Sequence, residues 1–265
     1  MHRNDLFNHI EANLTFCIFQ QVNDLVHAGG RDVVFVEVGA NDGVTANKLF
    51  PFVAHQGWTG LSIEPVPQAF GQLTANYAPH PQVTTLNMAV TDTSGTLPFY
   101  QVANEAPEWC SMLSSFDRQT ITKHATMIPD IERHIEQIAV ESAPLSALCR
   151  DHALAELDVL VVDAESHDDI VINTLDFETY RPSVINFEHR HMSAERLHTL
   201  DRKLVSLGYT RAILWADTAY LRGALLEDES IQHILRALPA LIPAYDREWG
   251  NGNWFEQHNG PALAA

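Results

Sequence analysis

A short apolar segment that runs into an acidic, glycine-containing turn is the feature that most constrains this chain. Residues 33–38 read Val-Val-Phe-Val-Glu-Val and are followed by Gly39-Ala-Asn-Asp-Gly43. β-Branched and aromatic residues in such a short run are typical of a strand that is buried on both faces. The two glycines permit backbone angles, and a close ligand approach, that a Cβ atom would block. We therefore predict a strand, a tight turn and then a helix.

A second apolar segment, residues 61–63, also ends in an acid, Glu64, which Pro65 follows. A carboxylate at the end of the second strand of such a unit can accept hydrogen bonds from both hydroxyls of a ribose. The two strand ends together therefore predict a site for a nucleoside cofactor.

The charge of the first turn indicates which nucleoside fits. A dinucleotide places its pyrophosphate on the bare amides of a G-x-G-x-x-G turn, whereas here the glycine spacing differs and Asp42 occupies the turn. An adenosine cofactor that carries a sulfonium and an amino group, but no phosphate, would be attracted by Glu37 and Asp42. This pattern favours S-adenosylmethionine. The simpler alternative is an ordinary strand, turn and helix in which Asn41 or Asp42 is a capping residue.

Composition limits the class of protein and its partners. A chain of 265 residues with 46% hydrophobic content can bury the core of one α/β domain with additions. Its formal net charge of -18 opposes broad contact with phosphate groups, so we expect neither a nucleic acid nor a membrane partner. No apolar run is long enough to cross a bilayer. Three cysteines without a C-x-x-C pair, and no signal-peptide pattern, favour a cytoplasmic location.

Hydrophobic periodicity divides the chain into regions. We predict a helical extension over residues 1–30, a Rossmann-like domain over 31–225 and a C-terminal helix and tail over 226–265. Residues 103–138 are irregular, and a connection of this length predicts an insertion that forms part of the substrate pocket or a lid. A solvated decoration is the alternative for this insertion.

Within these regions, the patterns predict individual elements. Pro51 is expected to bend or break the first helix of the domain, and the last two strands are expected to form an antiparallel hairpin. Helices are expected at 5–28, 44–55, 68–77, 131–138, 146–152, 170–175, 193–207 and 231–238, and strands at 83–90, 96–102 (an edge strand), 157–162, 183–187, 209–215 and 217–221.

Polar side chains follow two of these strands directly. Asp163 and Glu165 follow residues 157–162, and Glu188 follows residues 183–187. Parallel strands joined by right-handed crossovers end at one edge of a sheet, and ligands bind at that edge. At the end of the third strand, Asn87 or Asp92 can accept a hydrogen bond from the amine of an adenine; the alternative role of each is that of a turn former.

Several of these segments occur together in an order that resembles one family. They are V-E-V-G-A-N-D-G, I-E-P-V-P-x-A-F, N-M-A-V-T-D, S-M-L-S-S-F, L-D-V-L-V-V-D-A-E-S-H-D-D and P-S-V-I-N-F-E-H, between about residues 33 and 190. They look like the FkbM family of S-adenosylmethionine-dependent methyltransferases. The resemblance implies an α/β, class I methyltransferase fold: a seven-stranded, mostly parallel sheet with one antiparallel strand and helices on both faces. It also implies methylation of a hydroxyl on a sugar, a lipid-linked glycan or a natural-product scaffold.

The resemblance also implies roles for individual residues. It places the cofactor's methionine end near the first turn, its ribose at Glu64, and Ser115 near the pocket. The chain has Ser166, His167 and Asp168 where the family commonly has glycine, a small residue and Glu, so the substrate side departs from the family pattern. The expected cofactor-binding residues are Glu37, Gly39, Asn41, Gly43, Glu64, Pro65, Asn87, Asp163 and Glu165.

Two routes for removing the acceptor's proton stay open. A divalent metal that lowers the pKa of the hydroxyl could be held by Asp163, Glu188 and His189, where the imidazole would favour zinc, manganese or iron over magnesium. Without a metal, His189 or His167 would be the base, beside Asp163. We expect a small-molecule or glycan acceptor and leave a homo-oligomer open. The alternatives are a catalytically silent cofactor-binding scaffold, a nicotinamide dehydrogenase, or transfer to an amide or carboxyl group.

Overall fold

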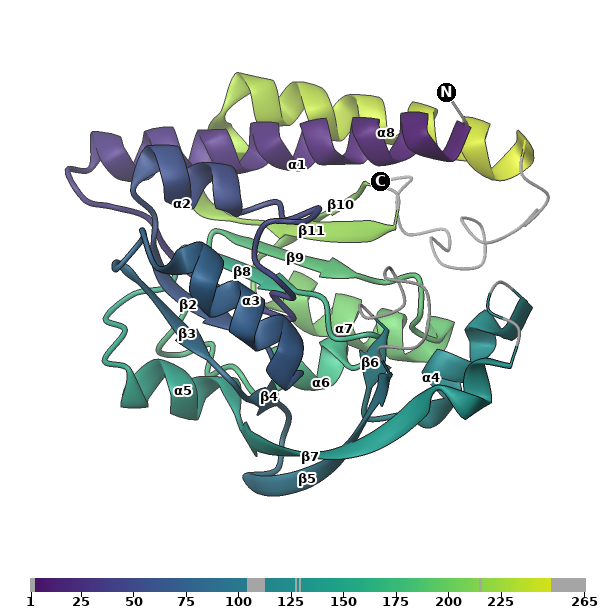
Figure 1. Ribbon diagram of the computed structural model, residues 1–265. Coiled ribbons are helices and arrows are strands. Elements are labelled where there is room, and N and C mark those ends of the chain that lie inside the picture. The colour runs from purple at the N-terminus through teal and green to yellow at the C-terminus, as the bar shows by residue number, and fades with distance from the viewer. Residues whose placement is uncertain (1–2, 104–112, 127, 129, 215, 249–265) are drawn as a thin grey trace. The chain divides into compact units, whose positions relative to one another are not determined.

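The computed structural model describes residues 3–103, 113–126, 128, 130–214 and 216–248 (Figure 1). Part of the predicted insertion, 104–112, and the tail from 249 onward lie outside these residues. The chain divides into two compact units, Asp32–Pro182 and Met1–Arg31 with Ser183–Ala265. Among the described residues, no helix combines the length and the apolar character that a membrane span requires.

A parallel sheet of four strands forms the centre of the Asp32–Pro182 unit. Its order is β8 (Val159–Val162), β1 (Val34–Val38), β2 (Thr59–Ile63) and β3 (Val83–Leu86). β1 therefore has a hydrogen-bonded neighbour on each side, and four of its five residues are buried. The prediction that the first apolar segment is a buried strand is confirmed.

The helix after the first turn begins later than the sequence pattern predicts. Residues 44–49 form turns, and α2 spans Phe50–Gln56 with Pro51 in its first turn. Proline fits there because the first N–H groups of a helix have no intrahelical partner. The prediction that Pro51 bends or breaks a helix over 44–55 is therefore wrong. The other helices of the unit are α3 (Pro67–Tyr77), α4 (Arg118–Thr122), α5 (Leu145–Asp151) and α6 (Asp168–Asn173), with 3-10 turns η2 (Lys123–Thr126) and η3 (Ile131–Arg133).

A second sheet of this unit corrects three predictions. Its order is β4 (Ala89–Val90), β7 (Ile135–Ala143), β5 (Gly95–Val102) and β6 (Ser114–Ser115). The predicted strand over 83–90 is two strands in two sheets, and the predicted edge strand over 96–102 lies between β7 and β6. The predicted helix over 131–138 is a 3-10 turn followed by β7. Its apolar side chains, Ile135, Ile138 and Val140, pack into two small clusters with residues of β5, contacts that a sequence window does not contain.

The other unit combines the two ends of the chain. α1 (Arg3–Ala28) is one continuous helix that packs against α8 (Glu229–Glu248). Between them in sequence lie β9 (Val184–Glu188), α7 (Ala194–Ser206), β10 (Thr210–Ile213), β11 (Asp217–Leu221) and η4 (Gly223–Glu227). β11 is antiparallel to both β9 and β10, which confirms the predicted hairpin. In this unit α1 and α8 lie on one side of the strands and α7 on the other (Figure 1).

The three strands of this unit and the four parallel strands of Asp32–Pro182 are the strands of a seven-stranded sheet. β11 is its one antiparallel strand, and it makes two antiparallel pairs because it has a neighbour on each side. The predicted α/β fold is therefore confirmed.

Candidate functional site

The carboxyl ends of the parallel strands in Asp32–Pro182 carry a cluster of acids. Asp163 directly follows β8, and its N–H donates to the carbonyl of Val38 at 2.9 Å, so the end of β8 lies beside the end of β1. Burial raises the pKa of four other carboxyls, and the charge of Asp163 raises each of them further. We call this set the carboxylate cluster: Glu37, Glu64, Asp163, Glu165 and Asp168.

Glu37 lies at the centre of the sheet and is only 5% exposed. Its two carboxylate oxygens accept hydrogen bonds from Asn47 Nδ2 at 2.7 Å and Ser62 Oγ at 3.1 Å. Burial raises the pKa of Glu37 to about 7, although these two hydrogen bonds lower it; Asp163 and Glu64 raise it further. Glu37 is therefore a buried acid whose pKa lies near neutral pH.

Glu64 connects the turn after β1 with the turn after β2 through hydrogen bonds of its carboxylate. Its Oε2 accepts from the N–H of Asn41 at 2.9 Å, and its Oε1 accepts from the N–H of Val66 at 2.8 Å. Burial raises the pKa of Glu64 to about 7 against these hydrogen bonds. Asn87 Nδ2 donates to the carbonyls of Glu64 and Pro65 at 2.9 and 3.1 Å, so its Oδ1 is the amide atom suited to accept from an adenine amine.

The two glycines of the first turn are required by the packing of the protein itself. Gly39 has φ +83°, and a Cβ there would lie 1.9 Å from the carbonyl oxygen of Asp163. A Cβ at Gly43, φ +77°, would lie 2.4 and 2.5 Å from side-chain atoms of Tyr77 and Leu73. Close approach of a ligand is therefore not needed to explain either glycine.

Asp42 has a local structural role. Its carboxylate accepts from the N–H groups of Val44 and Thr45 at 2.9 and 2.7 Å and from Thr45 Oγ1 at 2.6 Å. Partial burial raises its pKa, but the hydrogen bonds from Thr45 and Val44 outweigh this and hold the pKa below its usual value. Asp42 therefore closes a local turn; it does not cap a helix, because α2 begins at Phe50 with Leu49 as its N-cap residue. The acids of the site are those of the carboxylate cluster.

The turn after β8 holds the remaining acids in a strained backbone. Glu165 and Ser166 have φ +47° and +75°, in the left-handed region that non-glycine residues rarely adopt. Burial and Asp163 together raise the pKa of Glu165 to about 8. Asp168 is fully buried, accepts from the N–H of Ala164 at 3.3 Å, and has a pKa that burial and then Asp163 raise well above its usual value. Ser115 Oγ donates to the carbonyl of Glu165 at 3.0 Å.

Asp168, Asn47 and Ser62 were not among the predicted site residues. Asp168 belongs to the D-A-E-S-H-D segment, where its acid type was a usable signal. Asn47 and Ser62 carry no such signal, because only their hydrogen bonds to Glu37 connect them to the site.

His167, a predicted base, is held by two neighbours in the same unit. Its Nε2 lies 3.2 Å from Thr91 Oγ1, and its ring centroid lies 4.9 Å from that of Phe116. The ring is thus oriented, with one nitrogen already in a hydrogen bond.

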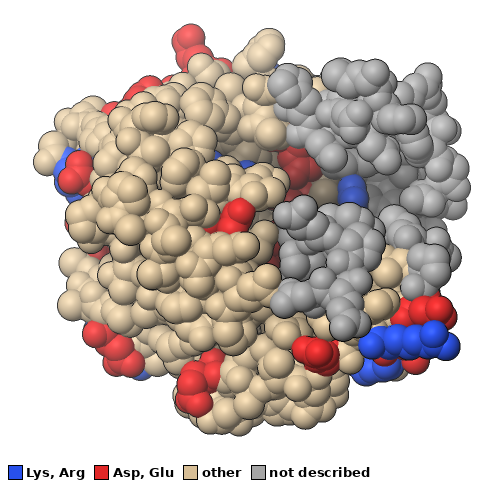
Figure 2. Space-filling view, viewed as in Figure 1, with Lys and Arg blue, Asp and Glu red and all other residues tan. Residues whose placement is uncertain are grey.

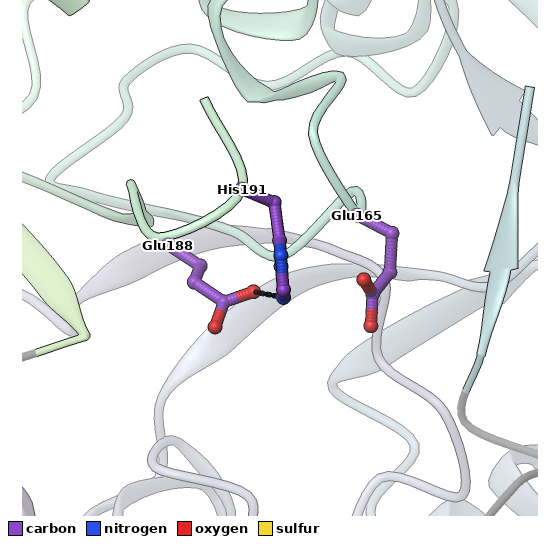
Figure 3. Close-up of side chains that lie close together, drawn as sticks. All are labelled: Glu165, Glu188 and His191. Carbon is purple, nitrogen blue, oxygen red and sulfur yellow. Dashed lines mark ion pairs between the residues drawn. The ribbon is translucent and has the colours of Figure 1, made fainter. Parts of the chain in front are cut away.

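The end of β9, in the other unit, carries Glu188, His189 and His191. His191 Nε2 lies 3.6 Å from Glu188 Oε2, and Figure 3 shows these two side chains pointing toward one another. His189 is 2% exposed, and its Nδ1 lies 2.8 Å from Thr218 Oγ1. The structure thus brings His191, which was not among the predicted ligands, to Glu188. Glu165, also drawn in Figure 3, belongs to Asp32–Pro182, as does Asp163, so the predicted metal set of Asp163, Glu188 and His189 draws on both units.

Acidic side chains are visible on the surface of this negatively charged protein. On the face in Figure 2, red Asp and Glu side chains are spread over the described residues, and the blue group at its lower edge lies beside red side chains.

The seven strands, with β11 as the antiparallel one, and the acidic strand ends define a class I methyltransferase, the fold of enzymes that depend on S-adenosylmethionine. Residues 37–215 match the family described as Methyltransferase FkbM domain, which is more than half of the 265 residues. The chain belongs to the FkbM methyltransferase family.

Solved structures with similarity to this chain include methyltransferase FkbM from Methylobacillus flagellatus KT (12% identity, TM-score 0.45), Aeropyrum pernix fibrillarin with natively bound S-adenosyl-L-methionine (11%, 0.38) and the N-terminal domain of human METTL16 in complex with SAH (10%, 0.41). The match to the Methylobacillus protein covers 72% of this chain and 44% of that chain. The match to fibrillarin covers 72% and 65%, and the match to METTL16 covers 80% and 70%, in the same order. The match thus spans less than half the length of the Methylobacillus protein. No curated protein matches the sequence.

Proposed function

We propose that this methyltransferase transfers the methyl group of S-adenosylmethionine to a hydroxyl of a sugar or natural-product scaffold. The observation that carries the choice of cofactor is the carboxylate cluster. Ionising the buried acids of this cluster beside the charge of Asp163 costs free energy, and a bound cation would offset that cost. The methyl donor carries a sulfonium and an ammonium group and no phosphate, so it fits this cluster, whereas a pyrophosphate would be repelled.

Named residues would hold each part of the cofactor. Glu37, Asp163 and Glu165 would face the cationic methionine end. Each oxygen of Glu64 already accepts one backbone N–H and retains a second lone pair for a ribose hydroxyl. Asn87 Oδ1 would accept from the adenine amine. The loop residues Gly39, Asn41, Gly43 and Pro65 would line the same end of the sheet.

The bound cofactor would supply an electrophilic methyl carbon, and the chain must position the acceptor and remove its proton. His189 is the first candidate base. If its Nδ1–H donates to Thr218 Oγ1, the lone pair lies on Nε2, which can then accept the proton. His167 and the exposed Asp163 are the other candidates.

A divalent metal is the alternative way to activate the hydroxyl. Asp163, Glu188 and His189 are the predicted ligands, and the 3.6 Å approach of His191 to Glu188 makes His191 a further candidate. Methyl transfer measured with and without a chelator separates the two routes. Loss of activity on chelation, restored by added metal, would support the metal route, and unchanged activity would support a base.

The proposal is tested first by binding. Isothermal calorimetry should show binding of S-adenosylmethionine and none of NAD⁺, and the reverse result would refute the cofactor assignment. Transfer of a labelled methyl group should then be measured in cell extract, with the acceptor expected to be a cytoplasmic small molecule or glycan. Cofactor binding without a methylated product would favour the silent scaffold instead. A product methylated on an amide or a carboxyl would refute O-methylation.

A further inference from the structure

Glu37 carries a charge that the interior of its unit does not require. It lies in β1 and is 5% exposed; burial raises its pKa most, and the two charged neighbours that raise it further, Asp163 and Glu64, are acids like itself. A glutamine at this position would have the same shape and would avoid the cost of burying a carboxylate. Buried ionisable groups of this kind are concentrated at functional sites. A positively charged ligand would explain why the charge is present.

Both oxygens of the Glu37 carboxylate are held by neutral donors from separate elements. Oε1 accepts from Nδ2 of Asn47, in the turn before α2, at 2.7 Å, and Oε2 accepts from Oγ of Ser62, in β2, at 3.1 Å. Two bonds from two elements fix the plane of the carboxylate, which a single bond would leave free to rotate. Each oxygen retains a second lone pair, and because neither donor is charged, neither neutralises the negative charge of Glu37.

The start of α2 fixes the orientation of the Asn47 amide. Its Oδ1 accepts from the N–H groups of Leu49 and Phe50, each at 2.8 Å. Only the oxygen of an amide side chain accepts hydrogen bonds, so these two contacts leave the NH2 group to donate to Glu37. Leu49, the N-cap residue of α2, makes no side-chain cap of its own. Asn47 therefore links the start of α2 to the acid of β1.

The backbone that presents Asn47 adopts a rarely populated conformation. Ala46, immediately before it, has φ +55°, in the left-handed region. In the same connection between β1 and α2, Asn41 has φ +50° and donates its N–H to Glu64. Residues in this region persist only where the surrounding structure holds them, and they cluster at ligand sites. The strained positions of this connection thus adjoin or supply the groups that hold Glu37 and Glu64.

We propose that Asn47 and Ser62 are positioning residues, which hold the Glu37 carboxylate in the orientation that receives the cationic methionine end of S-adenosylmethionine. The inference rests on the proposed function, since it assigns the residues that prepare the same cofactor site. A charge that is held in place before the ligand arrives needs no rearrangement on binding, so more of the interaction appears as affinity. Without the two donors, the carboxylate would rotate and would meet the cofactor less often in the productive orientation.

Asn47→Ser separates this role from the cap of α2. Serine can accept from N–H groups at the start of a helix, as asparagine does, but its side chain is too short to reach Glu37. Asn76→Ser is the matched control: Nδ2 of Asn76 donates to the carbonyl of Asp42 at 2.9 Å, so this variant also removes an amide donor to the same connection but leaves Glu37 untouched. Ser62→Ala removes the other donor to Glu37 and is the second variant if Asn47→Ser does not fold.

Isothermal calorimetry of S-adenosylmethionine binding is run on the full chain and on these variants, with and without Glu37→Gln. Asn47→Ser should weaken binding about tenfold, and Asn76→Ser by less than about twofold. In the Glu37→Gln background, Asn47→Ser should change the affinity by less than about twofold, because the charge that it positions is gone. Ser62→Ala should show the same dependence on Glu37. A residue that acts only through the fold would lose the same factor in both backgrounds.

Three results would overturn the proposal: unchanged affinity in Asn47→Ser and Ser62→Ala, an equal loss in Asn76→Ser, or an equal loss with and without Glu37→Gln. If Glu37→Gln binds too weakly to be measured, the comparison with Asn76→Ser decides. Absence of S-adenosylmethionine binding in the wild type would refute the proposed function, and the positioning role with it. The two failures are distinguishable, because a wild type that binds while Asn47→Ser binds equally well refutes the positioning role alone.

Discussion

Replacing Glu37 by glutamine should stabilise the cofactor-free protein, and more so as the pH rises. Glu37 is 5% exposed and has a pKa of about 7, against 4.5 for an ordinary glutamate, mainly because of burial. Glutamine has the same shape and no charge. It can accept from Asn47 Nδ2 through its carbonyl and donate to Ser62 Oγ, so both hydrogen-bonding positions remain usable.

The size of the effect follows from linkage between proton binding and folding. Between pH 4.5 and about 7 the unfolded chain has lost the Glu37 proton while the folded protein retains it, so the stability of the wild type falls through this window and is lowest above it. At 1.36 kcal/mol per pH unit the shift corresponds to about 3 kcal/mol. We expect about 2 kcal/mol in practice, since interactions with Asp163 and Glu64 are shared rather than additive.

Urea unfolding of the wild type and Glu37→Gln at pH values from about 4 to 8.5, a range that starts below the window, measures this difference. The variant should be close to the wild type at the acid end and about 2 kcal/mol more stable at the alkaline end. Comparing the two proteins cancels the titration of the histidines, and Glu195→Gln, which removes the same charge from an exposed position of α7, should show no such trend. A pH-independent difference, or a variant less stable at high pH, would refute the argument from burial. The same substitution should weaken S-adenosylmethionine binding.

Three further predictions concern the turn, the ribose and the base. Gly39→Ala should cost more than ~3 kcal/mol of unfolding free energy, because its Cβ would lie 1.9 Å from the Asp163 carbonyl oxygen. Gly57→Ala is the control: Gly57 also has a positive φ but lies in open space, so this variant should cost about 1 kcal/mol. Equal losses for the two variants in urea unfolding would contradict the prediction. Glu64→Ala should weaken S-adenosylmethionine binding by about 1 to 3 kcal/mol in calorimetry, and unchanged affinity would remove Glu64 from the cofactor site. His189→Ala should abolish methyl transfer and spare cofactor affinity, and an active variant would exclude this histidine as the base.

Local sequence patterns were sufficient where a feature depends on neighbouring residues. The β-branched run of β1, the helix closed before Gly208 and the hairpin of β10 and β11 each follow from periodicity and turn residues within a short window. The same windows misplaced β7, because its apolar spacing is compatible with a helix until β5 is available as a partner.

The order of several motifs along the chain also predicted the family, which the match over residues 37–215 establishes. The sequence likewise placed Glu37, Glu64, Asp163 and Glu165 at strand ends, because the end of each apolar run is visible in the sequence.

By itself, then, the sequence determined the fold class, the strand ends that carry acids and the family, since these depend on residue type and local spacing. Only the tertiary structure decided that Asp168 joins the carboxylate cluster, that Glu64 accepts from the N–H of Asn41, and that His189 lies beside Thr218. It also decided which acids are buried, and hence which have raised pKa values. The physical reason is that strand register and desolvation depend on residues far apart in the chain, whose approach no local pattern records.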